Sequence, residues 1–263
     1  MKPWLVKKFL NAGEIMHEAL KKPRKMAETV KNARAIIQHE INISRDPARK
    51  IGLESLRRYS ITPRMALSRA LKARLPKEYE HSVMVADLSA QILRELKRTH
   101  KGIWLTERGI RKRALLHDIG KLGVKKSVLS KKGALSAADR AELDRHIGLG
   151  ADLARGVFPK RQFEVTAKHH EHLDGTGKII GIAGAKAAPR DVLNDSIPLE
   201  VRIVAVADSL CAAVGPKEYK DVTDAGRRKI RAVLAGMRKQ KGKYDQNVVD
   251  ALQALLIPSK KYK

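Results

Sequence analysis

Apolar residues recur every three or four positions along most of this chain, which is the spacing of an α-helix that buries one face. The clearest stripe starts at His81 and continues through Val85, Leu88, Ile92 and Leu96. The same spacing predicts further helices over residues 106–118, 136–153, 160–171, 199–213, 222–240 and 245–257. Only 4 % of the residues are aromatic, so helix faces rather than sheets are expected to supply the core. We therefore expect an all-α helical bundle.

Helix-breaking residues divide the chain into parts. Pro23, the Asp46-Pro47 step and Pro63 punctuate residues 1–74, which we expect to form a small accessory segment of three short amphipathic helices. Residues 75–258 are expected to form the main domain, and residues 259–263 a basic tail. A chain of 263 residues with 43 % hydrophobic content is long enough to bury one sizeable core.

The charge of the chain is strongly positive and unevenly distributed. Lys and Arg number 55 against 28 Asp and Glu, for a formal net charge of +27. Residues 1–74 hold 18 basic and 6 acidic side chains, and residues 227–263 hold 11 and 2. Such an excess predicts an anionic substrate or partner. The two basic regions are candidates for binding an acidic protein or nucleic acid, with ordinary solvated surface as the alternative.

The cysteine content and the hydropathy point to a cytoplasmic location. Cys211 is the only cysteine, which excludes an intrachain disulfide and a cluster of thiolate metal ligands. Charges at Lys7, Lys8 and Glu14 interrupt any apolar signal region near the start, and no apolar run reaches membrane length. We expect a soluble, cytoplasmic protein with no membrane insertion.

Five histidines and two aspartates fall on inward faces of the predicted helices. They are His81, His117, Asp118, His146, His169, His170 and Asp208. Buried imidazoles and carboxylates are tolerated together only if something cationic satisfies them. Seven donors exceed the need of one ion, so the economical arrangement is two divalent ions that share Asp118. One inward histidine alone would more often be a hydrogen-bonded core residue; the complete set favours metal binding.

The chemistry of such a site is hydrolysis of a phosphoester. Two divalent ions close together lower the pKa of a bridging water and hold the oxygens of a phosphoryl group during displacement. The expected nucleophile is therefore a metal-activated bridging hydroxide. Lys121 follows Asp118 by three residues, so it can lie near the same helix end and attract the phosphate. The alternative for Lys121 is a cap at the negative end of the helix.

Five segments together resemble the HD superfamily, and within it the HD-GYP family of bacterial phosphodiesterases that hydrolyse cyclic di-GMP. These segments are residues 80–86 (EHSVMVA), 115–124 (LLHDIGKLGV), 144–150 (DRHIGLG), 169–177 (HHEHLDGTG) and 197–208 (IPLEVRIVAVAD). The resemblance covers residues 76–257 and implies an HD-domain helical bundle in a bacterial cytoplasm. It implies metal ligation by the same seven residues, with Asp118 bridging two ions, Fe or Mn, and Lys121 at the reacting phosphate. It also implies substrate contacts from Lys217 and Lys220.

The chain departs from the family pattern at three places. The Gly-Tyr-Pro that names the family is Gly177-Lys178-Ile179, and an Asp usually found three residues after Asp208 is Cys211. A Glu that binds a third metal in some members is Lys77 here, so two ions are expected, although Glu78 and Glu80 are near enough in sequence to approach.

Three functions stay open on the sequence alone. The first is a cyclic di-GMP phosphodiesterase. The second is an HD phosphohydrolase acting on another nucleotide or nucleic-acid phosphoester, and the third is a non-catalytic cyclic di-GMP receptor. Turnover of different phosphoesters separates the first two, and binding without product identifies the third.

Overall fold

The computed structural model describes residues 63–154, 158–177, 197–220 and 223–257. In chain order, their helices are α4 (Pro63–Arg74), α5 (Pro76–Thr99), α6 (Glu107–Ala114), the 3-10 helix η1 (Ile119–Gly123), α7 (Lys126–Leu129), α8 (Ala137–Ala154), α9 (Lys160–Lys168), α10 (Leu199–Lys220), α11 (Asp224–Lys239) and α12 (Gln246–Leu256). The described residues contain no strand, which confirms the predicted all-α fold. Within the same residues, no helix has the length and apolar character needed to span a bilayer.

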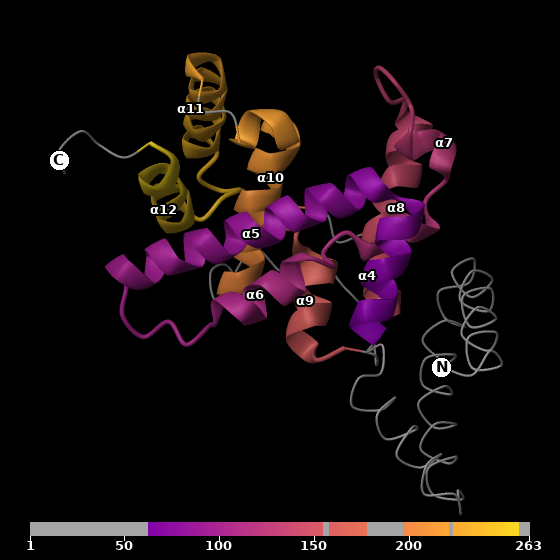
Figure 1. The fold of residues 1–263 in the computed structure, drawn as a ribbon, viewed down its shortest axis with the longest axis horizontal. Helices are drawn as coiled ribbons and strands as arrows, with labels where there is room; N and C mark the ends of the chain where they lie inside the picture. The colour runs from indigo at the N-terminus through magenta and orange to yellow at the C-terminus, as the bar shows by residue number, and fades with distance from the viewer. Residues whose placement is uncertain (1–62, 155–157, 178–196, 221–222, 258–263) are drawn as a thin grey trace, which may run out of the picture.

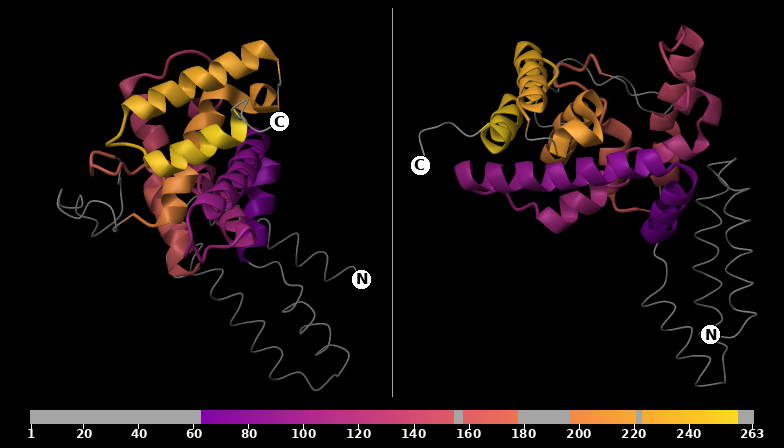
Figure 2. Two further views of the ribbon diagram at one scale, coloured as in Figure 1. Left: turned by 90° about the vertical axis from the view of Figure 1, so that its left-hand side faces the viewer. Right: turned by 45° about the horizontal axis from the view of Figure 1, so that its top comes forward.

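The long helix α5 crosses the molecule and organises the other helices around it (Figure 1). Helices α6 and α9 lie along one side of α5, while α10 crosses it and α11 and α12 cover one end; α4, α7 and α8 lie toward the other end (Figure 2). The predicted stripe of α5 is the core face, because Val85, Leu88, Ile92 and Leu96 are all buried. They share one hydrophobic cluster with the apolar faces of α10, α11 and α12.

A second, smaller hydrophobic cluster joins α4 to the segment around η1. Leu67 and Leu71 of α4 are buried against Leu116, Ile119 and Leu122. The last helix of the predicted accessory segment therefore packs against the main domain, directly behind the His-Asp motif. The predicted boundaries of the three parts stay predictions, and residues 1–62 lie outside the described residues.

The ends of two predicted helices are wrong in a way that matters for the site. The helix predicted over residues 106–118 starts as expected, because Thr106 Oγ1 caps it by accepting a hydrogen bond from the Gly109 amide. It ends at Ala114, however, and the Leu116 and His117 amides bond to carbonyls three residues back, which tightens the chain into a turn. Helix α9 likewise ends at Lys168 rather than at residue 171. Four of the seven donors consequently lie in turns, not on helices.

The other predicted helices agree with the structure more closely. Ser136 and Asp139 exchange side-chain to backbone hydrogen bonds at the start of α8, and this capping box fixes the start of the helix predicted over residues 136–153. Helix α10 extends beyond the predicted residue 213, through a break at Gly215 where φ is 77°. This left-handed conformation suits glycine, which lacks a Cβ. Cys211 is buried in the core, as expected of a small hydrophobe.

Candidate functional site: a buried cluster of imidazoles and carboxylates

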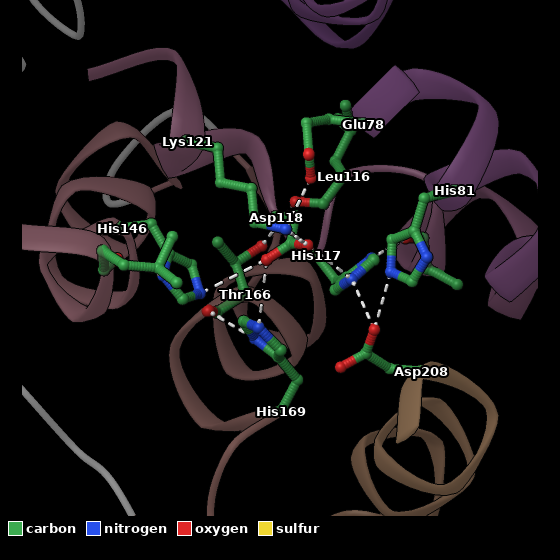
Figure 3. A network of polar contacts seen from close by, with 12 residues as sticks. Glu78, His81, Leu116, His117, Asp118, Lys121, His146, Thr166, His169 and Asp208 are labelled. Atoms are coloured by element: carbon green, nitrogen blue, oxygen red, sulfur yellow. Dashed lines mark hydrogen bonds and ion pairs between the residues drawn. The ribbon is translucent and has the colours of Figure 1, made fainter. Parts of the chain in front are cut away.

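The structure brings the seven predicted donors together in two overlapping groups. One group is Asp118, His146, His169 and His170, and the other is His81, His117, Asp118 and Asp208. Within each group the donor atoms lie within 4.8 Å of one another. Asp118 belongs to both groups, and Figure 3 shows its carboxylate between imidazoles that approach from two sides.

Three helices and two turns position these side chains. His81 comes from the first half of α5, His146 from the middle of α8 and Asp208 from the middle of α10. The turn that follows α6 supplies His117 and Asp118, and the turn that follows α9 supplies the remaining pair of histidines. The cluster thus forms where the ends of two short helices meet the sides of three longer ones.

The two oxygens of Asp118 face different groups of donors. Asp118 Oδ1 lies 3.3 Å from Nε2 of His146 and 3.4 Å from Nε2 of His169. Asp118 Oδ2 lies 3.1 Å from Nε2 of His117. A carboxylate with one oxygen toward each of two donor groups has the arrangement required of a bridging ligand.

Asp208 completes the group on the side of α5 and α10. Its Oδ1 lies 2.8 Å from Nε2 of His81 and 3.5 Å from Nε2 of His117 (Figure 3). The two imidazoles therefore converge on one carboxylate oxygen from α5 and from the turn after α6.

Backbone hydrogen bonds fix the tautomers of three imidazoles. Nδ1 of His117, His146 and His169 lies 2.7, 2.7 and 3.1 Å, respectively, from the carbonyl oxygen three residues earlier in the chain. A carbonyl oxygen only accepts, so Nδ1 carries the proton and Nε2 keeps its lone pair. This is the second interaction that metal-binding histidines usually make, and it turns each Nε2 toward Asp118.

The buried lone pairs test whether a cation fits. Nε2 of His117, His146 and His169 and Oδ1 of Asp118 are buried without a hydrogen-bond partner among the described residues. Leaving several polar atoms unsatisfied in one place is costly, unless a cation accepts their lone pairs. Imidazole nitrogens and carboxylate oxygens are donors of the kind that Fe, Mn and Zn accept. The donor set fits divalent metal ions.

The protonation states also favour metal binding. Burial lowers the pKa of His146, and it lowers that of His170 to about 3 with help from His169. Although burial raises it, the pKa of Asp118 falls well below its usual value because His117 and nearby Lys121 are close. Two neutral imidazoles thus stand beside an ionised carboxylate, which are the forms that bind metals.

His117 behaves differently when no cation is present. Burial lowers its pKa, but Asp118 and Asp208 outweigh burial and raise the pKa to about 10. A proton on His117 and a divalent cation therefore compete for the same pair of carboxylates.

Lys121 contacts both the carboxylate cluster and an acidic residue of α5. Its Nζ lies 2.7 Å from Asp118 Oδ2 and 2.6 Å from Glu78 Oε2 (Figure 3). Lys121 is thus held by ion pairs and does not cap a helix end. Glu78 approaches the site, as its sequence position allowed, by pairing with Lys121. The signal for this contact was its place three residues before His81, on the same side of α5.

Some predicted site residues lie outside what the structure describes. The backbone of Lys217 and Lys220 belongs to α10 beyond Gly215, but their side chains are outside the described residues, as are Lys178 and Ile179. The substrate contacts of Lys217 and Lys220 stay predictions.

The residues beside the paired histidines build the turn that holds them. Glu171 Oε1 accepts hydrogen bonds from the amides of His172 and Gly177. Asp174 Oδ1 accepts from the amide and the hydroxyl of Thr176. These contacts hold the backbone of the turn that follows the two histidines.

An all-helical domain with His-Asp donors converging in its interior belongs to the class of metal-binding helical hydrolase folds. A family model described as HD domain matches residues 79–213, and the chain belongs to this family. The resemblance to the HD superfamily is thereby confirmed.

Several characterised proteins are similar to the chain. The cyclic di-GMP phosphodiesterase response regulator RpfG of Xanthomonas campestris is 35 % identical over 143 residues, which cover 53 % of this chain and 34 % of that protein. The 3'3'-cGAMP-specific phosphodiesterase 3 of Vibrio cholerae is 34 % identical over 157 residues, which cover 59 % and 31 %, respectively. The chain therefore spans about a third of the length of these relatives. Among solved structures, the HD domain of the Listeria monocytogenes phosphodiesterase PgpH aligns with a TM-score of 0.49 and 19 % identity, over 72 % of this chain and 94 % of that one.

Proposed function

We propose that residues 75–258 form a phosphodiesterase that hydrolyses cyclic di-GMP with two divalent metal ions bound by the seven donors. The observation that carries this proposal is the shared carboxylate of Asp118, with one oxygen toward each group of buried imidazoles. Asp118 and the two groups of donors would hold two ions near each other, where both could act on one phosphoryl group. When bound, such ions supply a nucleophile at neutral pH by lowering the pKa of water.

The protein's own residues then have separate tasks. Asp118, buried and ionised, fixes the spacing of the two donor groups and is the central catalytic residue. Lys121, beside Asp118, is placed to donate to an oxygen of the reacting phosphate and to balance its charge. We assign Lys217 and Lys220 to the more distant phosphate of the substrate, as the family resemblance implies.

The metal we propose is Fe or Mn. Five imidazoles and two carboxylates form a nitrogen-rich set without thiolate, which suits borderline ions better than Mg or Ca. Metal analysis of protein purified with and without oxygen tests the identity, because ferrous iron is lost or oxidised in air.

The names of the relatives support a cyclic dinucleotide as substrate and also favour a second candidate. Some similar proteins are called cyclic di-GMP phosphodiesterases, and others, called specific for 3'3'-cGAMP, are comparably similar. The hybrid dinucleotide 3'3'-cGAMP is therefore the alternative substrate. Turnover of cyclic di-GMP, 3'3'-cGAMP and a linear dinucleotide, measured side by side, ranks them.

The decisive experiment compares a histidine inside the cluster with one outside it. His146→Ala is expected to lose metal and at least a hundredfold in turnover, whereas His100→Ala, at an exposed helix end, keeps both. Asp118→Ala is expected to lose both ions and all turnover. Two bound ions and wild-type turnover in Asp118→Ala would refute the mechanism. Tight binding of cyclic di-GMP without product, with Mn or Fe supplied, would instead identify a receptor.

The cytoplasmic location stays a prediction, as does the binding of an acidic protein or nucleic acid to the basic N- and C-terminal regions. The exposed arginines of α11 support the second of these. Ile230 and Leu234 are buried there, while Arg228 and Arg231 face outward.

A further inference from the structure

A cavity of about 290 Å³ opens on the molecule away from the carboxylate cluster. Its lining includes Trp104 from the segment that leads into α6, Arg161 from the first turn of α9, and Pro198 and Glu200 from the start of α10. Figure 1 shows α6 and α9 side by side below α5. The volume is near the lower limit of roughly 300 Å³ for small-molecule pockets, which suits a single ring system rather than a dinucleotide.

The cavity and the carboxylate cluster lie at different points along the same part of the chain. Arg161 precedes His169, in the turn after α9, by eight residues, and Glu200 precedes Asp208 by eight residues along α10. Eight residues of helix span about 12 Å. A ligand in the cavity therefore does not touch the donors of the cluster, and the two sites can be tested separately.

One wall of the cavity is an exposed aromatic platform. Trp104 is 64 % exposed, and no other large hydrophobic side chain among the described residues is exposed. The guanidinium of Arg161 lies 3.5 Å from the centroid of the indole ring. A largely exposed indole with a guanidinium over its ring is the kind of surface on which a nucleobase stacks.

The floor of the cavity carries a carboxylate with unused hydrogen-bonding capacity. Glu200 is only 2 % exposed, and its Oε1 has no hydrogen-bond partner within the part of the chain that the structure describes. The nearest cations are Nε of Arg113 at 3.7 Å and Nη1 of Arg161 at 3.6 Å, which are ion-pair distances too long for hydrogen bonds. A buried carboxylate in this state gains most from a ligand that offers adjacent N–H groups.

The surroundings of the cavity attract a negatively charged group. Lys101 and Lys160 are exposed and directly precede lining residues in the chain. Arg161 adds a third positive charge at the rim, against the carboxylates of Glu164 and Glu200 in the lining, and Glu164 lies 3.9 Å from Lys160. A ligand with a planar ring and a phosphate would use the indole and these cations together.

We propose that this cavity binds a guanine nucleotide, with the base stacked on Trp104 and its N–H edge toward Glu200. Guanine offers two adjacent N–H donors on one edge, which match a carboxylate, whereas adenine and cytosine each offer a single amino group. The nucleotide is either a free mononucleotide or the guanine end of a single strand. The proposal is independent of the phosphodiesterase activity proposed above.

The first test uses the fluorescence of Trp104 in the full-length chain. Trp4 is the only other tryptophan, so Trp4→Phe leaves Trp104 as the sole reporter. Titration with GMP is expected to quench the fluorescence, with at least tenfold weaker binding of AMP and CMP. A short single strand ending in guanine, titrated in parallel, distinguishes the two sources by its affinity relative to GMP. No quenching by either ligand up to millimolar concentration would overturn the proposal.

The second test uses calorimetry on variants of the lining. Loss of a stacking platform costs about 1–3 kcal/mol, so Trp104→Ala is expected to weaken GMP binding about 5- to 150-fold, and Trp104→Phe much less. Trp104 is exposed, so its loss leaves the fold intact, which a thermal melt checks. Glu200→Gln is expected to remove the preference for guanine over adenine. Lys126→Ala, an exposed charge on α7, serves as the matched control.

A third measurement excludes binding at the carboxylate cluster. GMP affinity is expected to be the same in wild-type protein and in the Asp118→Ala variant, since the cavity is lined by the first turns of α9 and α10, away from His169 and Asp208. Loss of GMP binding in Asp118→Ala, with retention in Trp104→Ala, would place the nucleotide at the cluster and refute the proposal. Equal GMP affinity in all lining variants would refute it as well.

Discussion

Replacing Gly120 with alanine adds only a methyl group, but we expect it to disrupt the site strongly. Gly120 lies in η1 between Asp118 and Lys121, and its Cα packs against the backbone of α8. A Cβ placed on it would lie 2.5 Å from the amide nitrogen of Gly150 and 2.8 Å from the carbonyl carbon of His146. All of these atoms are backbone, so no side chain can rotate away to make room.

The magnitude follows from the required displacement. Non-bonded carbon atoms prefer separations of roughly 3.5–4.0 Å, so η1 and α8 must move apart by about 1 Å. Overpacking of this kind costs about 1–3 kcal/mol or more of the free energy of unfolding. The same shift separates Asp118, which directly precedes η1, from His146 on α8, and a misplacement of about 1 Å costs roughly a hundredfold in rate. Gly120→Ala should therefore lose both stability and metal.

The assay pairs this variant with a glycine that has space around it. Gly236 lies inside α11, and a Cβ there meets nothing within 4 Å. Gly236→Ala is expected to stabilise the protein by about 0.5–1 kcal/mol and to keep metal content and turnover. Urea denaturation gives the free energies of unfolding, and metal analysis gives the stoichiometry. Wild-type stability and metal content in Gly120→Ala would refute the close packing of η1 on α8.

Three further predictions concern separate parts of the molecule. Glu78→Gln is expected to lower kcat/KM about tenfold with unchanged metal content, because Glu78 positions Lys121 through a charged hydrogen bond. The control is Glu80→Gln, at an exposed position, and kinetics of Glu78→Gln equal to those of wild type would contradict this role. Hydrogen bonds from Lys131 and Ser136 lower the pKa of Asp139 to about 2. The contribution of Asp139 to stability is therefore complete above about pH 4 and is lost as the pH falls toward 2. The melting temperatures of wild type and Asp139→Asn should differ at pH 7 and converge as the pH falls toward 2. Leu71→Ala, at a fully buried position of α4, should cost about 2–5 kcal/mol in urea denaturation, and a smaller loss would show that α4 is not part of the fold.

The stripe of α5 and the identity of the clustered residues could be predicted from sequence because each rests on local information. Burial of Leu88 and Ile92 follows from helical spacing alone. The inward imidazoles were recognised because isolated polar groups on apolar faces need a partner. The family resemblance then ordered the same residues into one site.

Two other features could not be predicted from the sequence, and the physical reason is the same for both. Helix α6 ends before His117 because the chain tightens there to bring Gly120 against α8, a contact between segments that are distant in the chain. The pocket formed by Trp104 and Glu200 likewise joins residues almost a hundred positions apart. Such contacts depend on tertiary packing, which overrides local helix propensity.

Contacts with three different helices hold the segment around Asp118 in place. Behind it, Leu116 and Ile119 are anchored in the hydrophobic cluster with α4. Beside it, Gly120 packs on α8, and Lys121 ties η1 to α5 through an ion pair. A carboxylate fixed from three directions keeps its two oxygens in place before any cation arrives. Preorganisation of this kind reduces the reorganisation required during reaction, so the packing of α4, α5 and α8 around η1 serves the chemistry as well as the fold.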